Sequence, residues 1–130
     1  MKPIESLPLI PGEIADYRLS EEGILYSYSK SPVRTIENIN NNVRLVQQIT
    51  GGRKVPLLIF LSKSPVPDKA TRIFSRQQLP VIYTAMAMVG QPGLSQLIMR
   101  ILFKFQQPPI PMKSFTDEEK ARDWLLQYVQ

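Results

Sequence analysis

The clearest hydrophobic pattern in the chain is an apolar run at residues 55–61, which a polar, proline-containing loop follows. A run this short, rich in branched side chains and bounded by turn-forming residues, is typical of a strand buried on both faces. Asp68 ends the loop, and its carboxylate suits the cap of a helix with Ala70 and Ile73 on its inner face. The pattern therefore predicts an interior strand at residues 54–61, then a loop, then a helix.

The residues before this unit predict a β-hairpin and a helix. Apolar and polar residues alternate at residues 14–19 and again at 24–29, which is the pattern of two strands joined by a turn. Apolar side chains then recur every three or four positions at residues 36–49, which places them on one face of a helix. Thr35 is the expected cap of this helix, and Gly51 is its expected end.

The remaining residues predict two more strands and two more helices. A second apolar run at residues 81–89 reads as a strand that begins after a break at Pro80. A third helix is expected at residues 94–105, and a short strand at residues 112–115. A capping box from Thr116 to Glu119 would start the last helix.

The order β-β-α-β-α-β-α-β-α predicts the fold class. Strands alternate with helices once the hairpin is complete, which indicates a mixed, largely parallel sheet with helices packed on it. We therefore expect a single α/β domain at residues 13–130, with a four- or five-stranded sheet and about four helices. Residues 1–12 contain three prolines and form an expected N-terminal arm.

Composition narrows the possible chemistry. The chain has 130 residues and a net charge of +5, but its basic residues are scattered, so a nucleic-acid partner is not expected. It has no His and no Cys, which removes imidazole and thiolate catalysis and leaves only carboxylates as zinc ligands. No apolar run approaches the roughly 18 residues of a membrane span, and no signal peptide is visible. We expect a cytoplasmic protein that is not an enzyme and has no cofactor or metal.

Three stretches carry a resemblance to a known family. They are GILYSYSK at residues 23–30, DKATR at residues 68–72 and FTDEEKARDWL at residues 115–125. With the order of elements, they resemble the STAS domain, the fold of bacterial anti-sigma-factor antagonists, and more closely an uncharacterised bacterial branch of it. The resemblance covers roughly residues 13–129. The fold is also similar to the lipid-binding Sec14-like domains, which are larger.

The resemblance implies a binding module rather than an enzyme. In partner-switching antagonists, a Ser at the start of the helix after the central strand is phosphorylated, and its charge blocks binding. This chain departs from that pattern, because Asp68 occupies the cap and Ser62 and Ser64 lie earlier in the loop. The expected partner-binding loop comprises Ser62, Lys63, Ser64, Asp68 and Arg72. A simpler reading makes Asp68 only a cap, with Arg72 paired to it one turn later.

The third helix has apolar residues on more than one side. Its main stripe is expected to face the sheet and consists of Leu94, Leu97, Ile98, Ile101, Leu102 and Phe105. Met99 and Phe103 lie to one side of this stripe, next to Arg100. Such a helix is either deeply buried or meets a partner, so Met99, Arg100 and Phe103 are the expected self-association residues of a homodimer.

Two classes of function remain open. The first is a regulatory or protein-interaction module, homodimeric or switching between protein partners that the sequence does not identify. The second is a carrier of a lipid or another small ligand, with an apolar pocket under the third helix. A cavity between that helix and the sheet would favour the carrier, whereas a flat apolar patch against a second copy would favour the module.

Overall fold

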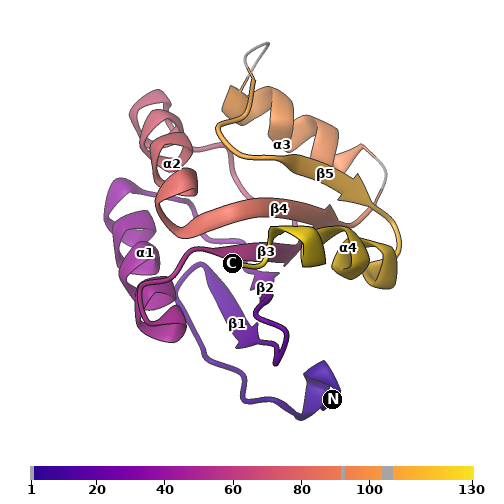
Figure 1. Cartoon of the computed structure of the whole chain (residues 1–130). Helices are drawn as coiled ribbons and strands as arrows, with labels where there is room; N and C mark the ends of the chain where they lie inside the picture. The colour runs from indigo at the N-terminus through magenta and orange to yellow at the C-terminus, as the bar shows by residue number, and fades with distance from the viewer. Residues whose placement is uncertain (1, 92, 104–106) are drawn as a thin grey trace.

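Five strands form one sheet in the order β1-β2-β3-β4-β5 in the computed structural model, which describes residues 2–91, 93–103 and 107–130 (Figure 1). The strands are β1 (Ala15–Leu19), β2 (Leu25–Ser29), β3 (Val55–Phe60), β4 (Tyr83–Val89) and β5 (Met112–Phe115). The first two pair in antiparallel fashion as the expected hairpin, and each later strand is parallel to the one before it.

A helix follows each of the last four strands along the chain. The helices are α1 (Ile36–Thr50), α2 (Lys69–Ile82), α3 (Leu94–Phe103) and α4 (Glu118–Leu125). The strand at β3 is interior, as predicted, because Leu57 and Leu58 are both buried although they belong to clusters on opposite faces. The single α/β sheet with four helices confirms the predicted fold class.

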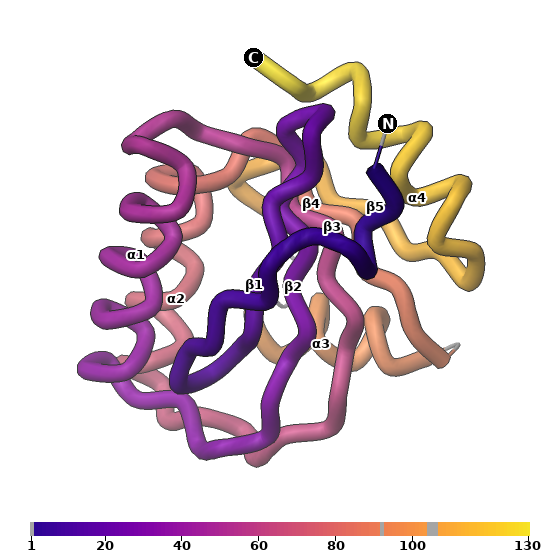
Figure 2. The backbone as a smooth tube through the Cα atoms, turned by 90° about the horizontal axis from the view of Figure 1, so that it is seen from below, coloured from indigo at the N-terminus to yellow at the C-terminus, as the bar shows by residue number. Residues whose placement is uncertain are grey.

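The helices are divided unequally between the two faces of the sheet. The helices α1, α2 and α3 cover one face, and α4 covers the other together with the first turn, η1 (Ile4–Ser6) (Figure 2). Consecutive parallel strands are added in one direction, so their right-handed crossovers place α1, α2 and α3 on the same side. The sheet therefore separates two hydrophobic clusters, one on each face.

The predicted caps of α1 and α2 are present. Thr35 accepts a hydrogen bond from the Asn38 amide at 3.1 Å, and the Asn38 side chain accepts one from the Thr35 amide at 2.8 Å. Gly51 ends α1 with a φ of 69°, a left-handed conformation that glycine adopts without steric strain. Asp68 accepts from the Thr71 amide at 2.8 Å, which fixes the start of α2 just after the loop.

Two predicted boundaries are wrong. The helix α2 continues through Pro80 to Ile82, because Leu79 and Ile82 are buried in the core and their packing outweighs the local break. The last helix is capped by Asp117, whose carboxylate accepts from the Glu119 amide at 2.9 Å, and not by Thr116. The predicted end of the third helix, at residue 105, lies outside the described residues.

Candidate functional site

A cavity of about 530 Å³ lies between the sheet and the helices α1, α2 and α3. Ligand pockets usually measure ~300–1,000 Å³, so a small organic molecule fits this space. Every strand, all three helices and the loop at residues 62–67 contribute to its wall. The cavity thus occupies the place, under the third helix, where the carrier alternative expected a pocket.

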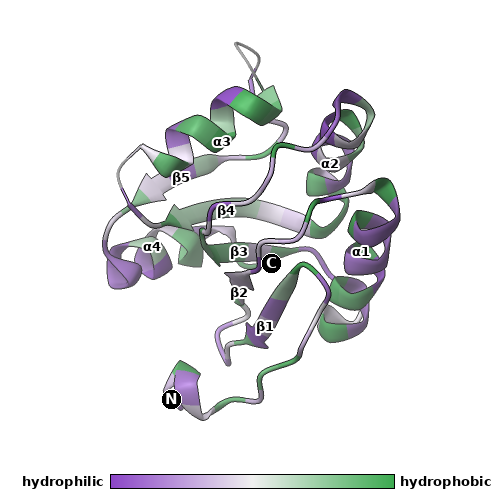
Figure 3. Cartoon of the chain, turned by 180° about the vertical axis from the view of Figure 1, so that it is seen from behind, coloured by the Kyte–Doolittle hydropathy of each residue, from purple (hydrophilic) through white to green (hydrophobic). Residues whose placement is uncertain are grey.

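The longest apolar stripe of α3 lines this cavity. Leu94, Leu97 and Ile98 contribute to its wall, as do Ile101 and Leu102. Leu97 keeps 48% of its surface exposed, and Figure 3 shows α3 as hydrophobic over most of its length. The protein's own side chains therefore cover the stripe only in part, which leaves apolar surface that a ligand can cover.

The apolar pair beside this stripe lies on the core side of α3. Phe103 is 1% exposed and belongs to the core cluster with Ile110, and Met99 packs against the same cluster. Arg100 is exposed. Of the two alternatives for this helix, deep burial therefore holds for Phe103 and a partner surface does not, because α3 is rotated so that the pair meets the core and the stripe meets the cavity. Self-association stays a prediction, with Phe103 no longer available to it.

A group of neutral polar side chains lies in the wall of the cavity. The Tyr17 hydroxyl donates to the Asn42 side-chain oxygen at 2.7 Å, and Tyr17, Ser27 and Tyr83 are all buried. Burial raises the pKa of Tyr17, and it raises the pKa of Tyr83 well above its ordinary value. Both phenols therefore stay protonated and can orient a polar group of a ligand by hydrogen bonding.

The sequence did not single out these four side chains. They come from β1, β2, α1 and β4, and no spacing along the chain connects them. The alternation in β1 places Tyr17 on the same face as buried Ala15. That Ser27 lies opposite Tyr17 on the neighbouring strand, however, follows only from the register of the hairpin. Asn42 joins the group only through its contact with Tyr17, 25 positions away in the chain, so its role depends on tertiary structure.

Cationic and hydroxyl groups lie where the cavity meets the ends of β2 and β3. Arg34 lines the cavity and donates from Nη1 to the carbonyls of Lys30 at 2.6 Å and Pro32 at 3.0 Å. Its Nη2 donates to the Ser29 hydroxyl at 3.0 Å. Burial lowers the pKa of the Arg34 guanidinium. The sequence treated Arg34 as part of a connection and did not propose it for the site.

The predicted partner-binding loop divides into two parts. Ser62, Lys63 and Ser64 line the cavity. Asp68 and Arg72 do not line it, since Asp68 caps α2 and Arg72 donates from Nη1 to the Pro67 carbonyl at 2.7 Å. The described residues hold no close ion pair between Asp68 and Arg72, but the Arg72 charge still contributes to the lowered pKa of Asp68, so the expected pairing is present only as a longer-range attraction.

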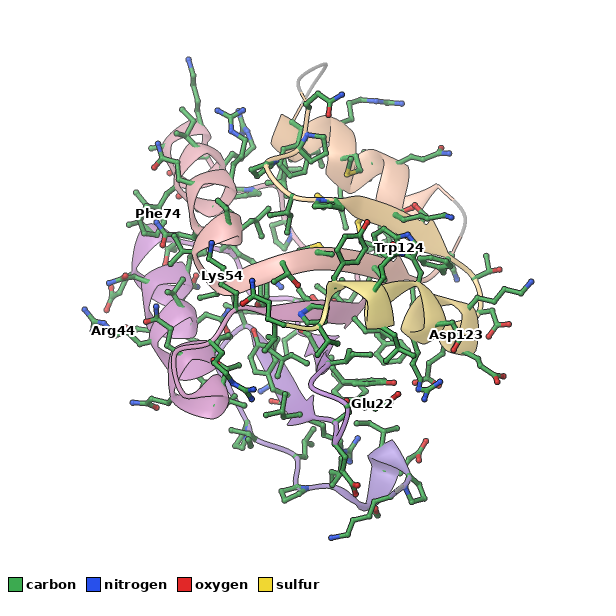
Figure 4. All side chains as sticks on the ribbon, in the orientation of Figure 1. Glu22, Arg44, Lys54, Phe74, Asp123 and Trp124 are labelled. Atoms are coloured by element: carbon green, nitrogen blue, oxygen red, sulfur yellow. The ribbon has the colours of Figure 1, made fainter. Side chains whose placement is uncertain are left out.

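The opposite face of the sheet is closed by α4. Arg122 donates from Nε to a Glu22 carboxylate oxygen at 2.8 Å, pairs with the same carboxylate through Nη2, and also contacts Asp123 at 3.1 Å. The hydrogen bond with Glu22 raises the pKa of Arg122. Figure 4 shows Glu22, Asp123 and Trp124 on the α4 side of the molecule. Arg122 thus links α4 to the turn after β1 through Glu22.

Metal-binding clusters and membrane-spanning helices are both absent from residues 2–91, 93–103 and 107–130, which the structure describes. Within these residues, no three Asp or Glu side chains lie close enough to hold a metal ion. None of the helices in the same residues has the length and apolar character that a membrane crossing requires.

Comparison with known proteins supports the fold. The model of a family described as a domain of unknown function, DUF7793, matches residues 17–129. A solved structure of an uncharacterised protein from Shewanella loihica PV-4, of the DUF3478 family and with a SpoIIAA-like fold, superimposes with a TM-score of 0.54. The alignment covers 92% of each chain at 20% identity, so it confirms the STAS-like fold and nothing finer. No curated protein sequence matches the chain.

Proposed function

The chain belongs to the DUF7793 family, a domain of unknown function, and we propose that it binds a small apolar molecule in the cavity under α3. The cavity itself carries the proposal. It is large enough for a ligand, and its wall is mainly aliphatic and methionine side chains with a few polar groups. This combination is typical of sites that bury an apolar body and orient one polar end.

The energetics of α3 favour an occupant. Fully burying a Leu or Ile side chain contributes about 1.5–3 kcal/mol, and the stripe at Leu94, Leu97 and Ile98 is only partly covered by protein. A ligand beneath α3 removes this surface from water without moving the core, because Met99 and Phe103 already anchor the other side of the helix. A binding role of this kind needs no catalytic group, consistent with the lack of His and Cys.

The protein-interaction module is the second candidate. The observation that favours it is the exposed Val66, at 61% of its surface, in the loop beside the cavity. The support for its proposed self-association surface is reduced, because Phe103 is buried within one chain. The two candidates are compatible, since a ligand in the cavity touches the same loop that a partner would contact.

A neutral fluorescent probe tests the proposal. Nile red is expected to bind the purified protein at one site, and Ile98→Trp, which fills the cavity, should weaken binding by about tenfold, a loss of ~1.4 kcal/mol. Gln96→Trp is the matched control, since Gln96 is exposed on the same helix and does not line the cavity. Absence of saturable binding, or equal binding by the wild type and Ile98→Trp, would contradict the proposed function.

A further inference from the structure

We infer that the ligand is an anionic amphiphile, whose carboxylate head is held by Arg34 and the Ser62 hydroxyl while its apolar tail extends under α3. This inference rests on the proposed function and adds the chemical class of the ligand. It follows from the charges of the cavity wall, from one unpartnered hydroxyl and from the topology that brings these groups together.

The charges in the cavity wall have one sign. Arg34 and Lys63 line the cavity, and no Asp or Glu is found among the described residues of its wall. Arg34 forms no ion pair with any described carboxylate, and its acceptors are neutral oxygens of the backbone and of Ser29. A partly buried cation beside an apolar space is stabilised by an anion, so the wall is complementary to a negatively charged head group.

The donors of Arg34 leave one position for such a group. Its described hydrogen bonds all use the two Nη atoms, so the Nε–H is without a hydrogen-bond partner in the described part of the chain. The bonds to the carbonyls of Lys30 and Pro32 hold the guanidinium in place before a ligand arrives. A preorganised guanidinium loses less conformational freedom on binding than a mobile Lys does.

The Ser62 hydroxyl supplies an independent observation. Ser62 lines the cavity, and its Oγ is buried and has no hydrogen-bond partner among the residues that the structure describes. Buried polar groups are nearly always hydrogen-bonded, so each exception requires an explanation. A carboxylate at this place accepts a hydrogen bond from the hydroxyl, once the Ser62 side chain turns toward it, and supplies the missing partner.

The topology brings Arg34 and Ser62 to the same edge of the sheet. The strands β2 and β3 are neighbours and parallel, with Tyr28 opposite Phe60. The segments that follow the two strands therefore start side by side at the same end of the sheet. Figure 2 shows the turn from β2 into α1 and the loop after β3 at the same lower edge of the molecule. Ligands of open α/β sheets bind at the carboxyl ends of strands, and here the cavity continues from that edge to α3.

The test compares hexadecanoate with hexadecan-1-ol, which share a tail and differ in the head group. Both are titrated against bound Nile red in the wild type, Arg34→Gln, Ser62→Ala and the control Arg44→Gln. Arg44 is exposed on α1 and does not line the cavity, so its replacement removes one positive charge without touching the site. Circular dichroism and thermal melts establish that each variant is folded, and Arg34→Met replaces Arg34→Gln if the latter does not fold, with the same expected loss of the preference.

We expect the wild type to prefer the carboxylate over the alcohol by about tenfold, the equivalent of one charge-assisted hydrogen bond. Arg34→Gln should abolish this preference by weakening binding of the carboxylate more than binding of the alcohol, Ser62→Ala should reduce the preference, and Arg44→Gln should retain it. Equal affinity of the wild type for the two ligands overturns the inference and leaves the proposed function in place. An equal loss for both ligands in Arg34→Gln also overturns it, because Arg34 then only shapes the loop. Failure of Nile red and of both ligands to bind contradicts the proposed function itself.

Discussion

The orientation of α3 can be tested by the unequal effects of two alanine substitutions. Phe103 and Leu97 are large apolar residues of the same short helix, but Phe103 is buried in the core and Leu97 faces the partly open cavity. Truncating a buried Phe to Ala costs about 3–5 kcal/mol, since the lost contacts leave a cavity. Truncating a half-exposed side chain outside the core usually changes stability by about 0.5 kcal/mol.

Urea unfolding of the ligand-free protein measures this difference. A domain of this size is stable by about 5–15 kcal/mol, so Phe103→Ala should remain folded but lose a large share of its stability. With a slope of ~1–3 kcal/mol per molar urea, its unfolding midpoint should fall by at least about 1 M. The midpoint of Leu97→Ala should stay close to that of the wild type.

The opposite order of effects would refute the reasoning. If Leu97→Ala is as destabilising as Phe103→Ala, the stripe packs against the sheet, as the sequence predicted, and the cavity is filled by the protein itself. Unequal slopes in the two unfolding curves would show a change in the unfolded or native ensemble, so the comparison is made only between variants with equal slopes.

Three further predictions follow from other parts of the chain. The hydrogen bonds from Thr71 hold the pKa of the Asp68 carboxyl below its usual value, so the stabilisation of the fold by this carboxylate is present at neutral pH and is lost as the pH falls through the folded-state pKa. Unfolding free energies measured from pH 7 to pH 3 should show this loss in the wild type and not in Asp68→Asn. An identical pH dependence of stability in the two proteins would contradict the prediction. Gly12→Ala should destabilise by about 1–3 kcal/mol in thermal or urea unfolding, because its Cβ would lie 2.4 Å from the Ala15 carbonyl oxygen, and an unchanged stability would argue against this path of the N-terminal arm. If the protein self-associates through α3, sedimentation should detect a dimer at tens of micromolar that Met99→Glu dissociates, whereas a monomer at that concentration rules the dimer out.

Local patterns predicted most of the fold because the decisive signals are short. The run at residues 55–61 can be buried on both faces only as an interior strand, and the cap at Thr35 needs only Asn38, three residues later. The error at Pro80 has the opposite origin. A proline is a local break, but burial of Leu79 and Ile82 depends on packing between α2 and the sheet, which no local pattern contains.

The site was predicted only in outline, for a physical reason. Helical spacing identifies which residues of α3 share a face, but it does not say whether side chains or an empty space lie opposite that face. The stripe around Leu97 was therefore assigned to the sheet, and Phe103 to a partner. The loop residues Ser62 and Lys63 were found because they follow a central strand, whereas Arg34 follows the neighbouring strand and gave no comparable signal.

The alternation of side chains in β4 explains why the cavity lies on one face of the sheet only. On the α4 side, β4 presents Ala85 and Ala87, which are fully buried, and small side chains let the helix approach the strand closely. The aromatic contact of Trp124 with Tyr128, whose ring centroids are 5.0 Å apart, fills the remaining space there.

On the other face, β4 presents Met86 and Met88, and both line the cavity. Methionine has three rotatable bonds and a polarisable sulfur, so it adapts to ligands of different shape and discriminates weakly among them. A tail that lies against such a wall is recognised by its apolar area more than by its outline. Selectivity among ligands must then come from groups that are fixed, and Arg34 is such a group because backbone carbonyls hold its guanidinium. We therefore expect ligands whose tails differ in shape but have equal apolar area to bind alike, and ligands that differ in head-group charge to be distinguished.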